Sequence, residues 1–154
     1  MKGMDWDTAL FLVGVFVIVG AVSSSGWLDR LAVWIAGAVG GNIGVAFTAI
    51  VALSVVVSAV VDNVPFLLVM IPVVQRVADD LHTPVPLLMF GLLIGACLGG
   101  NITPIGASAN VVAIGILRKQ GYTVSFREFM ALGIPFTIAA VVLACGFVWL
   151  VWAP

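Results

Sequence analysis

The sequence predicts an all-α membrane protein with transmembrane helices, a re-entrant hairpin and a broken helix. Of the 154 residues, 63% are hydrophobic and 8% are charged, and the mean hydropathy is +1.28. A typical soluble domain is about half apolar and about a quarter charged. The apolar residues form long uncharged blocks, and polar residues interrupt the apolar chain at two places. Blocks of about 20 apolar residues are typical of transmembrane helices.

The first apolar block predicts a transmembrane helix over residues 6–22. A cleaved signal peptide fits less well, because Lys2 is the only positive charge ahead of the block and Asp5 and Asp7 also precede it. The serines and glycine of "SSSGW" are loop-forming residues and end this helix. Residues 27–38 are short, rich in tryptophan and charged near one end, which is typical of a helix that lies in the membrane interface.

Two apolar runs flank the pair Asp62-Asn63 and predict a re-entrant hairpin over residues 43–75. The second run, residues 64–74, would form a helix of only about 16 Å at about 1.5 Å per residue. Such a helix is too short to cross a hydrocarbon core of about 30 Å. It suits one arm of a hairpin whose polar tip is buried in protein at mid-depth. A polar loop is expected after it, over residues 75–83.

The next uncharged block is too long for one straight helix, and its middle reads "GGNITPIGASAN", residues 99–110. Glycines, a proline and several polar side chains disfavour a regular helix there, since proline alone costs about 3 kcal/mol in a helix interior. We predict a broken helix over residues 85–117, with half-helices at 85–98 and 108–117 joined by unwound chain. After a charged loop, a last transmembrane helix is predicted over residues 129–152.

The distribution of positive charge predicts an orientation. Arg118, Lys119 and Arg127 form the largest positive cluster between the predicted helices. The positive-inside rule puts this cluster in the cytoplasm. Following the chain through the predicted elements then puts the N-terminus in the cytoplasm and the C-terminus outside. We expect an integral protein of the plasma (inner) membrane.

Asp62 is the only acidic or basic residue inside the apolar spans. Such residues usually face a cavity and mark the path of an ion or substrate. A purely structural reading applies to its neighbour, because Asn63 can cap a helix that starts at Val64, with Pro65 in its first turn. We expect both, with Asn63 as the cap and the carboxylate in a functional role.

The second interruption has the same sequence pattern as the first, because in both an asparagine precedes a proline within apolar chain. Half-helix N-termini present N–H groups to an anion, and unwound carbonyls can coordinate a cation. The structural alternative is a packing motif, since glycine and serine are common where membrane helices touch. Because Asn101, Thr103, Ser108 and Asn110 all occur in this stretch, we favour a binding site.

The stretches "SAVVDNVPFLLVMIPVV" and "GGNITPIGASANVVAIGILRKQGYTVSFREFMALGIP" resemble the C-terminal half of the ion transporter superfamily. The nearest branch is the arsenite-permease and pink-eyed-dilution group, related to citrate and dicarboxylate symporters. In that family each half contributes one hairpin and one broken helix, and the halves are inverted repeats. The resemblance therefore implies one inverted-repeat half and a substrate and ion site formed by Ser58, Asp62, Asn63, Gly100, Asn101, Thr103, Gly106, Ser108 and Asn110.

The sequence departs from the family in two respects. The dicarboxylate branch has a Ser-Asn-Thr signature at the hairpin tip, where this chain has Asp62-Asn63-Val64, and this disfavours dicarboxylate transport. A full transporter of this kind also needs both halves. We therefore expect the missing N-terminal inverted half or a second subunit as a partner, besides the lipid bilayer and a small anion or cation as substrate.

We expect a secondary active transporter half that moves an inorganic or organic anion and is coupled to an ion or proton gradient. Na⁺ or H⁺ would be the coupling ion, with sodium at the same residues, and no other cofactor or metal is expected. One alternative is a sodium/proton antiporter with Asp62 as the exchanging carboxylate. The other is a non-transporting membrane subunit or truncated remnant.

Other functional classes lack their motifs in this sequence. We find no nucleophile–base pair, nucleotide loop or metal-ligand cluster, so no enzyme is expected, and no basic stripe indicates a nucleic-acid partner. His82 is alone in a polar loop. Cys97 and Cys145 lie in apolar runs and are expected to be buried small apolar residues, without a disulfide.

Overall fold

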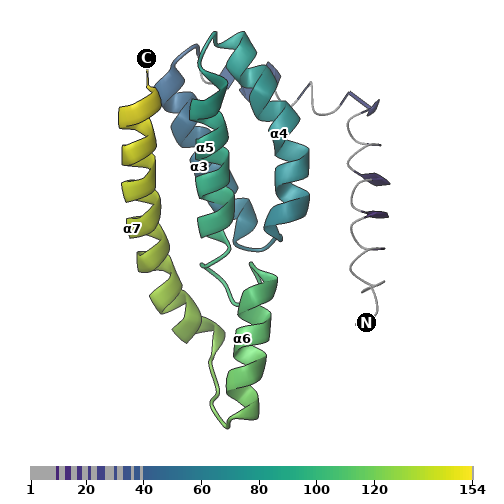
Figure 1. Cartoon of the computed structure of the whole chain (residues 1–154), viewed down its shortest axis with the longest axis vertical. Helices are drawn as coiled ribbons and strands as arrows, with labels where there is room; N and C mark the ends of the chain where they lie inside the picture. The colour runs from purple at the N-terminus through teal and green to yellow at the C-terminus, as the bar shows by residue number, and fades with distance from the viewer. Residues whose placement is uncertain are drawn as a thin grey trace, which may run out of the picture.

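The computed structural model describes residues 40–153 without a gap, together with residues 10, 13, 14, 17, 18, 21, 24–26, 30, 33–35, 37 and 38. The predicted helices at 6–22 and 27–38 fall mostly on positions outside the described residues. The continuous part contains α3 (Ile43–Ser58), α4 (Asn63–Asp80), α5 (Val85–Gly99), α6 (Ser108–Lys119) and α7 (Phe126–Trp152) (Figure 1). The described residues form helices and no strand, which confirms the predicted all-α class.

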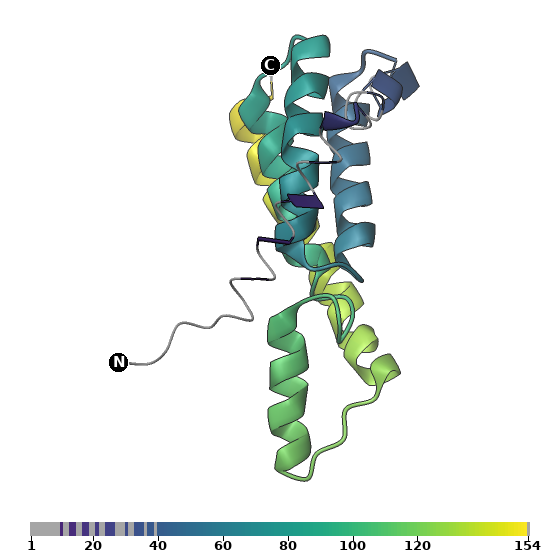
Figure 2. The same cartoon turned by 90° about the vertical axis from the view of Figure 1, so that its right-hand side faces the viewer.

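The helices form two unequal parts. α3, α4 and α5 lie side by side in one part, and α7 runs past them and ends lower down, beside the upper part of α6 (Figure 1). α5 is central, because it packs against α3, α4 and α7, whereas α3 and α4 barely touch each other. α6 projects beyond this bundle and contacts no other described helix (Figure 2).

The contact between α3 and α5 depends on glycine. Gly91, Gly95 and Gly99 recur at every fourth residue and so lie on one face of α5. A Cβ at Gly95 would lie 2.6 Å from the Ser54 Cβ, and a Cβ at Gly99 would lie 2.6 Å from the Val55 carbonyl oxygen. The two backbones therefore touch directly, as small residues allow between membrane helices.

The apolar core lies in the same part of the molecule. Buried side chains of α3, α4 and α5 fill the space around the central helix, with Val148 of α7 at its edge. α6 buries none of its residues. The largest core side chains without exposed surface are Ile50, Leu87, Leu88, Leu92, Val73, Val74 and Val77.

The second arm of the hairpin is longer than predicted. α4 has 18 residues and continues to Asp80, so the expected polar loop at 75–83 is mostly helix and the hairpin extends beyond residue 75. The reason is amphipathicity: Val77 and Ala78 are buried, whereas Arg76 and Asp79 are exposed. Counting uncharged residues ended the helix at the first charge, although the helical periodicity continues.

The broken helix has the predicted form. α5 and α6 correspond to the half-helices expected at 85–98 and 108–117, and residues 100–107 between them form turns and bends. α7 begins slightly before residue 129 because Ser125 and Glu128 form a capping box. In it, the Ser125 N–H donates to the Glu128 carboxylate at 2.8 Å.

α7 has 27 residues, or about 40 Å at about 1.5 Å per residue. Among the described helices it alone is long and apolar enough to cross a membrane, while α3 and α5 are apolar but shorter. The burial predicted for Cys97 is wrong, because its side chain is exposed on the outer face of α5; Cys145 is half-buried.

A methyl group added to the α3–α5 contact should loosen it. Gly95→Ala is expected to destabilise the protein by about 1–3 kcal/mol, because the new Cβ meets backbone and Cβ atoms of α3 that cannot move aside independently. Thermal unfolding in detergent measures the effect. Gly115→Ala in α6 is the control, since a Cβ there meets nothing within 4 Å. Equal stability of both variants would contradict the direct backbone contact.

Candidate site at the hairpin turn and the unwound segment

The turn between α3 and α4, residues 59–62, lies against the unwound segment, residues 100–107. The Thr103 hydroxyl donates to the Ala59 carbonyl, and Thr103 is buried. A Cβ at Gly106 would lie 2.8 Å from the Ala59 carbonyl oxygen, so only glycine allows this approach. The hairpin packs along α5 and not along α6. Its turn therefore meets the broken helix near the middle of the path that α5 and α6 trace.

Ser58 connects three elements at this junction. Its buried hydroxyl, at the end of α3, contacts the Ala96 carbonyl of α5 and the Asn63 Oδ1 atom of α4, the latter at 2.7 Å. A hydroxyl carries one proton and donates to one acceptor at a time, so the two carbonyl oxygens compete for it. Asn63 also limits space at the break, because a Cβ at Gly100 would lie 3.3 Å from its Oδ1 atom.

Asn110 holds the unwound segment in a compact loop. Its Nδ2 group donates to the Gly100 carbonyl at 2.8 Å and to the Thr103 carbonyl at 3.0 Å. An amide has two N–H donors and satisfies both acceptors at once. The Gly100 carbonyl follows the end of α5 and gains a partner in this way, which matters because an unpaired carbonyl is costly away from water, whereas the Thr103 carbonyl also accepts from the Gly106 N–H at 3.3 Å.

Asp62, and not the predicted Asn63, caps α4. The Val64 N–H donates to the Asp62 carboxylate at 3.3 Å, and Asn63 is the first helical residue. Aspartate and asparagine are about equally good caps, so the sequence alone did not decide between neighbours. Pro65 lies in the first turn, as predicted, where a missing N–H costs nothing. The half-buried Asp62 therefore has a structural role as the helix cap.

Eight of the nine predicted site residues fall into two groups, and the ninth, Asn63, contacts the Ser58 hydroxyl through its Oδ1 atom. The side chains of Ser58, Thr103 and Asn110 hydrogen-bond to backbone carbonyls of the junction. Gly100 and Gly106 allow the backbone segments of the junction to approach closely. Asn101 forms no side-chain hydrogen bond with any described residue, and Ser108 is exposed at the start of α6. No side chain caps α6. Asp62, Asn101 and Ser108 are thus the members most available to a ligand.

Two residues of α7 at the break were not predicted. Thr137 is 1% exposed, and its hydroxyl donates to the Leu98 carbonyl at 3.4 Å. Gly133, one turn earlier, packs directly on the Asn101 carbonyl, and a Cβ there would clash with it. The signal was present in the sequence, because a glycine and a threonine four residues apart mark one face of an otherwise large apolar helix.

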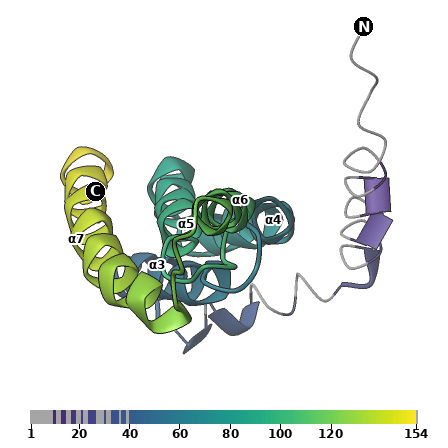
Figure 3. The same cartoon turned by 90° about the horizontal axis from the view of Figure 1, so that it is seen from below.

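A cavity of about 600 Å³ adjoins the break on the side of α6. Seen from below, α6 and α7 stand apart at this end of the molecule (Figure 3). Asn101 and Gly133 are at the cavity, and the remaining lining residues come from the end of α6, the connection and the first turns of α7: Leu117, Thr123, Val124, Glu128, Phe129, Leu132 and Phe136.

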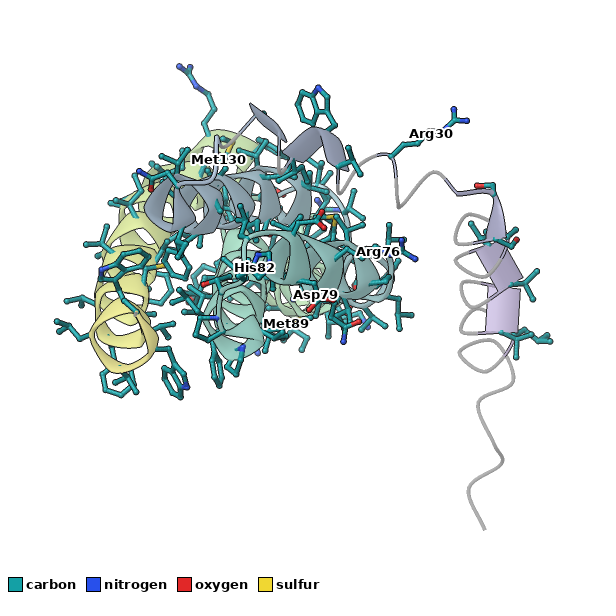
Figure 4. The ribbon with its side chains drawn as sticks, turned by 90° about the horizontal axis from the view of Figure 1, so that it is seen from above. Arg30, Arg76, Asp79, His82, Met89 and Met130 are labelled. Carbon is teal, nitrogen blue, oxygen red and sulfur yellow. The ribbon has the colours of Figure 1, made fainter. Side chains whose placement is uncertain are left out.

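The basic side chains of the described region lie away from the junction. Arg76 is near the end of α4, in the region of Asp79 and His82 (Figure 4), whereas Arg118 and Lys119 end α6 at the opposite end of the molecule. His82 is exposed, in agreement with a solvated loop residue. The described residues contain no group of three or more histidine, cysteine or acidic residues that could hold a metal ion.

A helical hairpin whose turn packs on a broken helix beside a membrane-length helix is the arrangement expected of part of a membrane transporter. The chain belongs to the citrate transporter family, CitMHS, which matches residues 1–153. It is 37% identical over 154 residues to an uncharacterized transporter of Mycobacterium tuberculosis, covering 97% of this chain and 35% of that protein. It is 37% identical over 144 residues to the P protein of Homo sapiens, covering 89% and 17%.

A third relative, an uncharacterized transporter of Synechocystis, is 34% identical over 171 residues, covering 99% of this chain and 38% of the relative. The chain thus spans little more than a third of the length of the bacterial transporters that it matches. No solved structure matches it. These relatives confirm the resemblance to the ion transporter superfamily.

The division of the site residues predicts which positions water can reach. With Cys97 and Cys145 replaced by serine, cysteines at Asn101 and Ser108 should react with a hydrophilic thiol reagent in reconstituted membranes. A cysteine at Thr103 should react at least about tenfold more slowly, because that side chain is 5% exposed and its hydroxyl bonds to the hairpin turn. A cysteine at the fully buried Leu92 sets the background. Uniform protection of Asn101 and Ser108 would mean that the segment is a dry packing contact.

Proposed function

We propose that this chain supplies one half of the substrate and coupling-ion site of a secondary active transporter for a small inorganic or organic anion. The observation that carries the proposal is the contact between the hairpin turn and the unwound segment. It brings the starts of two helices, α4 at Asn63 and α6 at Ser108, to one interrupted region of the chain. Irregular backbone at membrane depth is tolerated where it is buried in protein or lines a water-filled cavity.

The groups at this junction suit an anion bound by neutral donors. Helix N-termini carry a partial positive charge and free N–H groups, and the first turn of α6 has no side-chain cap. Asn101 and Ser108 add an amide and a hydroxyl. Among the described residues, those of the junction and the adjoining cavity include no lysine or arginine. The helix N-termini and the neutral polar side chains would therefore bind the anion in place of positively charged side chains.

Asp62 supports ion coupling. It is the one carboxylate at the hairpin turn, it is half-buried, and membrane carboxylates commonly exchange protons or cations. The same carboxylate supports a second candidate, sodium/proton antiport. In that case the ion exchanged at Asp62 would itself be the substrate, and no anion would be needed.

The distribution of charged ends supports the proposed orientation. The turn after α4 and the C-terminus lie at one end of the molecule, and the connection between α6 and α7 lies at the other (Figure 1). The second of these ends carries Arg118, Lys119 and Arg127, which the positive-inside rule assigns to the cytoplasm. We therefore propose an external C-terminus. The partner would be the complementary half of the site, from another chain or another part of a longer one.

The isolated chain should not transport. Purified and reconstituted as a monomer in liposomes, it is expected to give no saturable uptake of citrate, arsenite or sodium above that of empty liposomes, since half of the site is missing. Tracer uptake under an imposed sodium or proton gradient measures this. Saturable uptake by the monomer would contradict the half-site proposal. Uptake that requires a dimer would mean that two copies supply both halves.

The two roles of Asp62 can be separated by substitution in an assembled transporter. Asp62→Asn keeps a good helix cap and removes the charge, so folding should be retained while ion-coupled uptake falls to background. Asp62→Ala removes both and should also lower stability by about 1 kcal/mol. Unfolding and gradient-driven uptake are measured for both variants. Wild-type uptake and pH dependence in Asp62→Asn would leave the carboxylate with only its cap.

A further inference from the structure

α6 packs against no other helix of the described part of the chain. It buries none of its 12 residues and contacts no other described helix. Its attachment to the junction is through Asn110 in its first turn. Helices of about this length are marginal on their own in water, and most of their stability in proteins comes from packing. Lipid, or protein outside the described residues, must therefore cover α6.

The cavity beside α6 has the form of a groove that continues this uncovered face. Leu117 lines it from α6, and Leu132 and Phe136 line it from α7. Ala109 and Ala113 precede Leu117 at four-residue intervals, so they lie on the same face of α6, and both are exposed. Alanine at this spacing allows another helix to approach closely.

Asn101 indicates what fills the groove. Asn101 is half-buried and lines a largely apolar cavity, whose other polar lining residues are Thr123 and Glu128, and its side chain forms no hydrogen bond with any described residue. A lipid chain would leave the amide without a partner, and unpaired polar groups are costly in hydrocarbon. A protein segment with a donor or acceptor at that depth would pair with part of the amide, whose two N–H donors and one oxygen leave a further group for the ligand.

The length of the relatives indicates where such a segment comes from. The chain covers 35% of the M. tuberculosis relative, so about two thirds of that transporter lie outside the matched part. We propose that the groove between α6 and α7 receives an apolar transmembrane segment from the rest of a full-length transporter, with a hydrogen-bonding side chain opposite Asn101. This inference rests on the proposed function for the identity of the partner.

Photo-crosslinking tests the groove directly. The chain is co-expressed in membranes with the tagged two thirds of the M. tuberculosis relative that lie outside the matched part. The photoreactive residue p-benzoylphenylalanine replaces Leu132, which lines the groove and is 77% exposed. In the control it replaces Leu143, which is on the same helix, 75% exposed and away from the groove. The relative's own matched third, co-expressed in the same way, verifies that the split transporter assembles.

We expect an adduct with the tagged fragment at position 132 that is at least about fivefold more abundant than at position 143. Adding Asn101→Leu should reduce the adduct severalfold, whereas Ile105→Leu, an exposed position in the same segment, should not. Equal adducts at both leucines, only lipid adducts, or adducts between two copies of the chain would overturn the proposal. So would the absence of an adduct when the relative's own third assembles.

Uptake assayed on the same membranes separates this inference from the proposed function. An adduct at position 132 without uptake would support the groove and contradict transport by this assembly. Uptake without the adduct would support transport and contradict the groove as the contact with the rest of the transporter.

Discussion

The structure depends on the satisfaction of backbone carbonyls where the helix breaks. A break within apolar chain exposes peptide groups that lipid cannot pair. Here the hydroxyls of Ser58 and Thr137 contact carbonyls near the end of α5. The Asn110 amide donates to a carbonyl of the unwound loop, and the Thr103 hydroxyl donates to a carbonyl of the hairpin turn. The polar residues that look like a ligand site are in large part the support that makes the break possible.

This division changes the meaning of the polar motifs. Under the proposed function, side chains that already bond to carbonyls would act on a ligand indirectly, by positioning Asp62, Asn101 and Ser108. The glycines also support the break, because they leave room for backbone segments to approach each other. Gly95 and Gly99 let α5 approach α3, and Gly106 lets the loop reach the hairpin turn. Sites of this kind need rigid support, since a shift of about 1 Å can weaken binding or catalysis strongly.

Membership of the citrate transporter family agrees with this architecture, and the chain matches only 35% of the M. tuberculosis relative. The core is complete around α5, where three helices meet it. It ends at the break, and beyond this point α6 stands without a neighbour and the groove beside α7 is open. Support on one side and an open groove on the other are what the proposed half-site would require.

Composition and the two polar interruptions were enough to predict the membrane class, the broken helix and the candidate region for a site, which stays a prediction, because lipid allows few backbone solutions. The end of α4 was predicted wrongly from the first charged residue, because the helix has one buried face and continues past Arg76 to Asp80. Only the tertiary structure decided that Asp62 is the cap, that Cys97 faces outward and that Thr137 braces the break. These depend on which helix face meets which neighbour, and residue order along one segment does not contain that information.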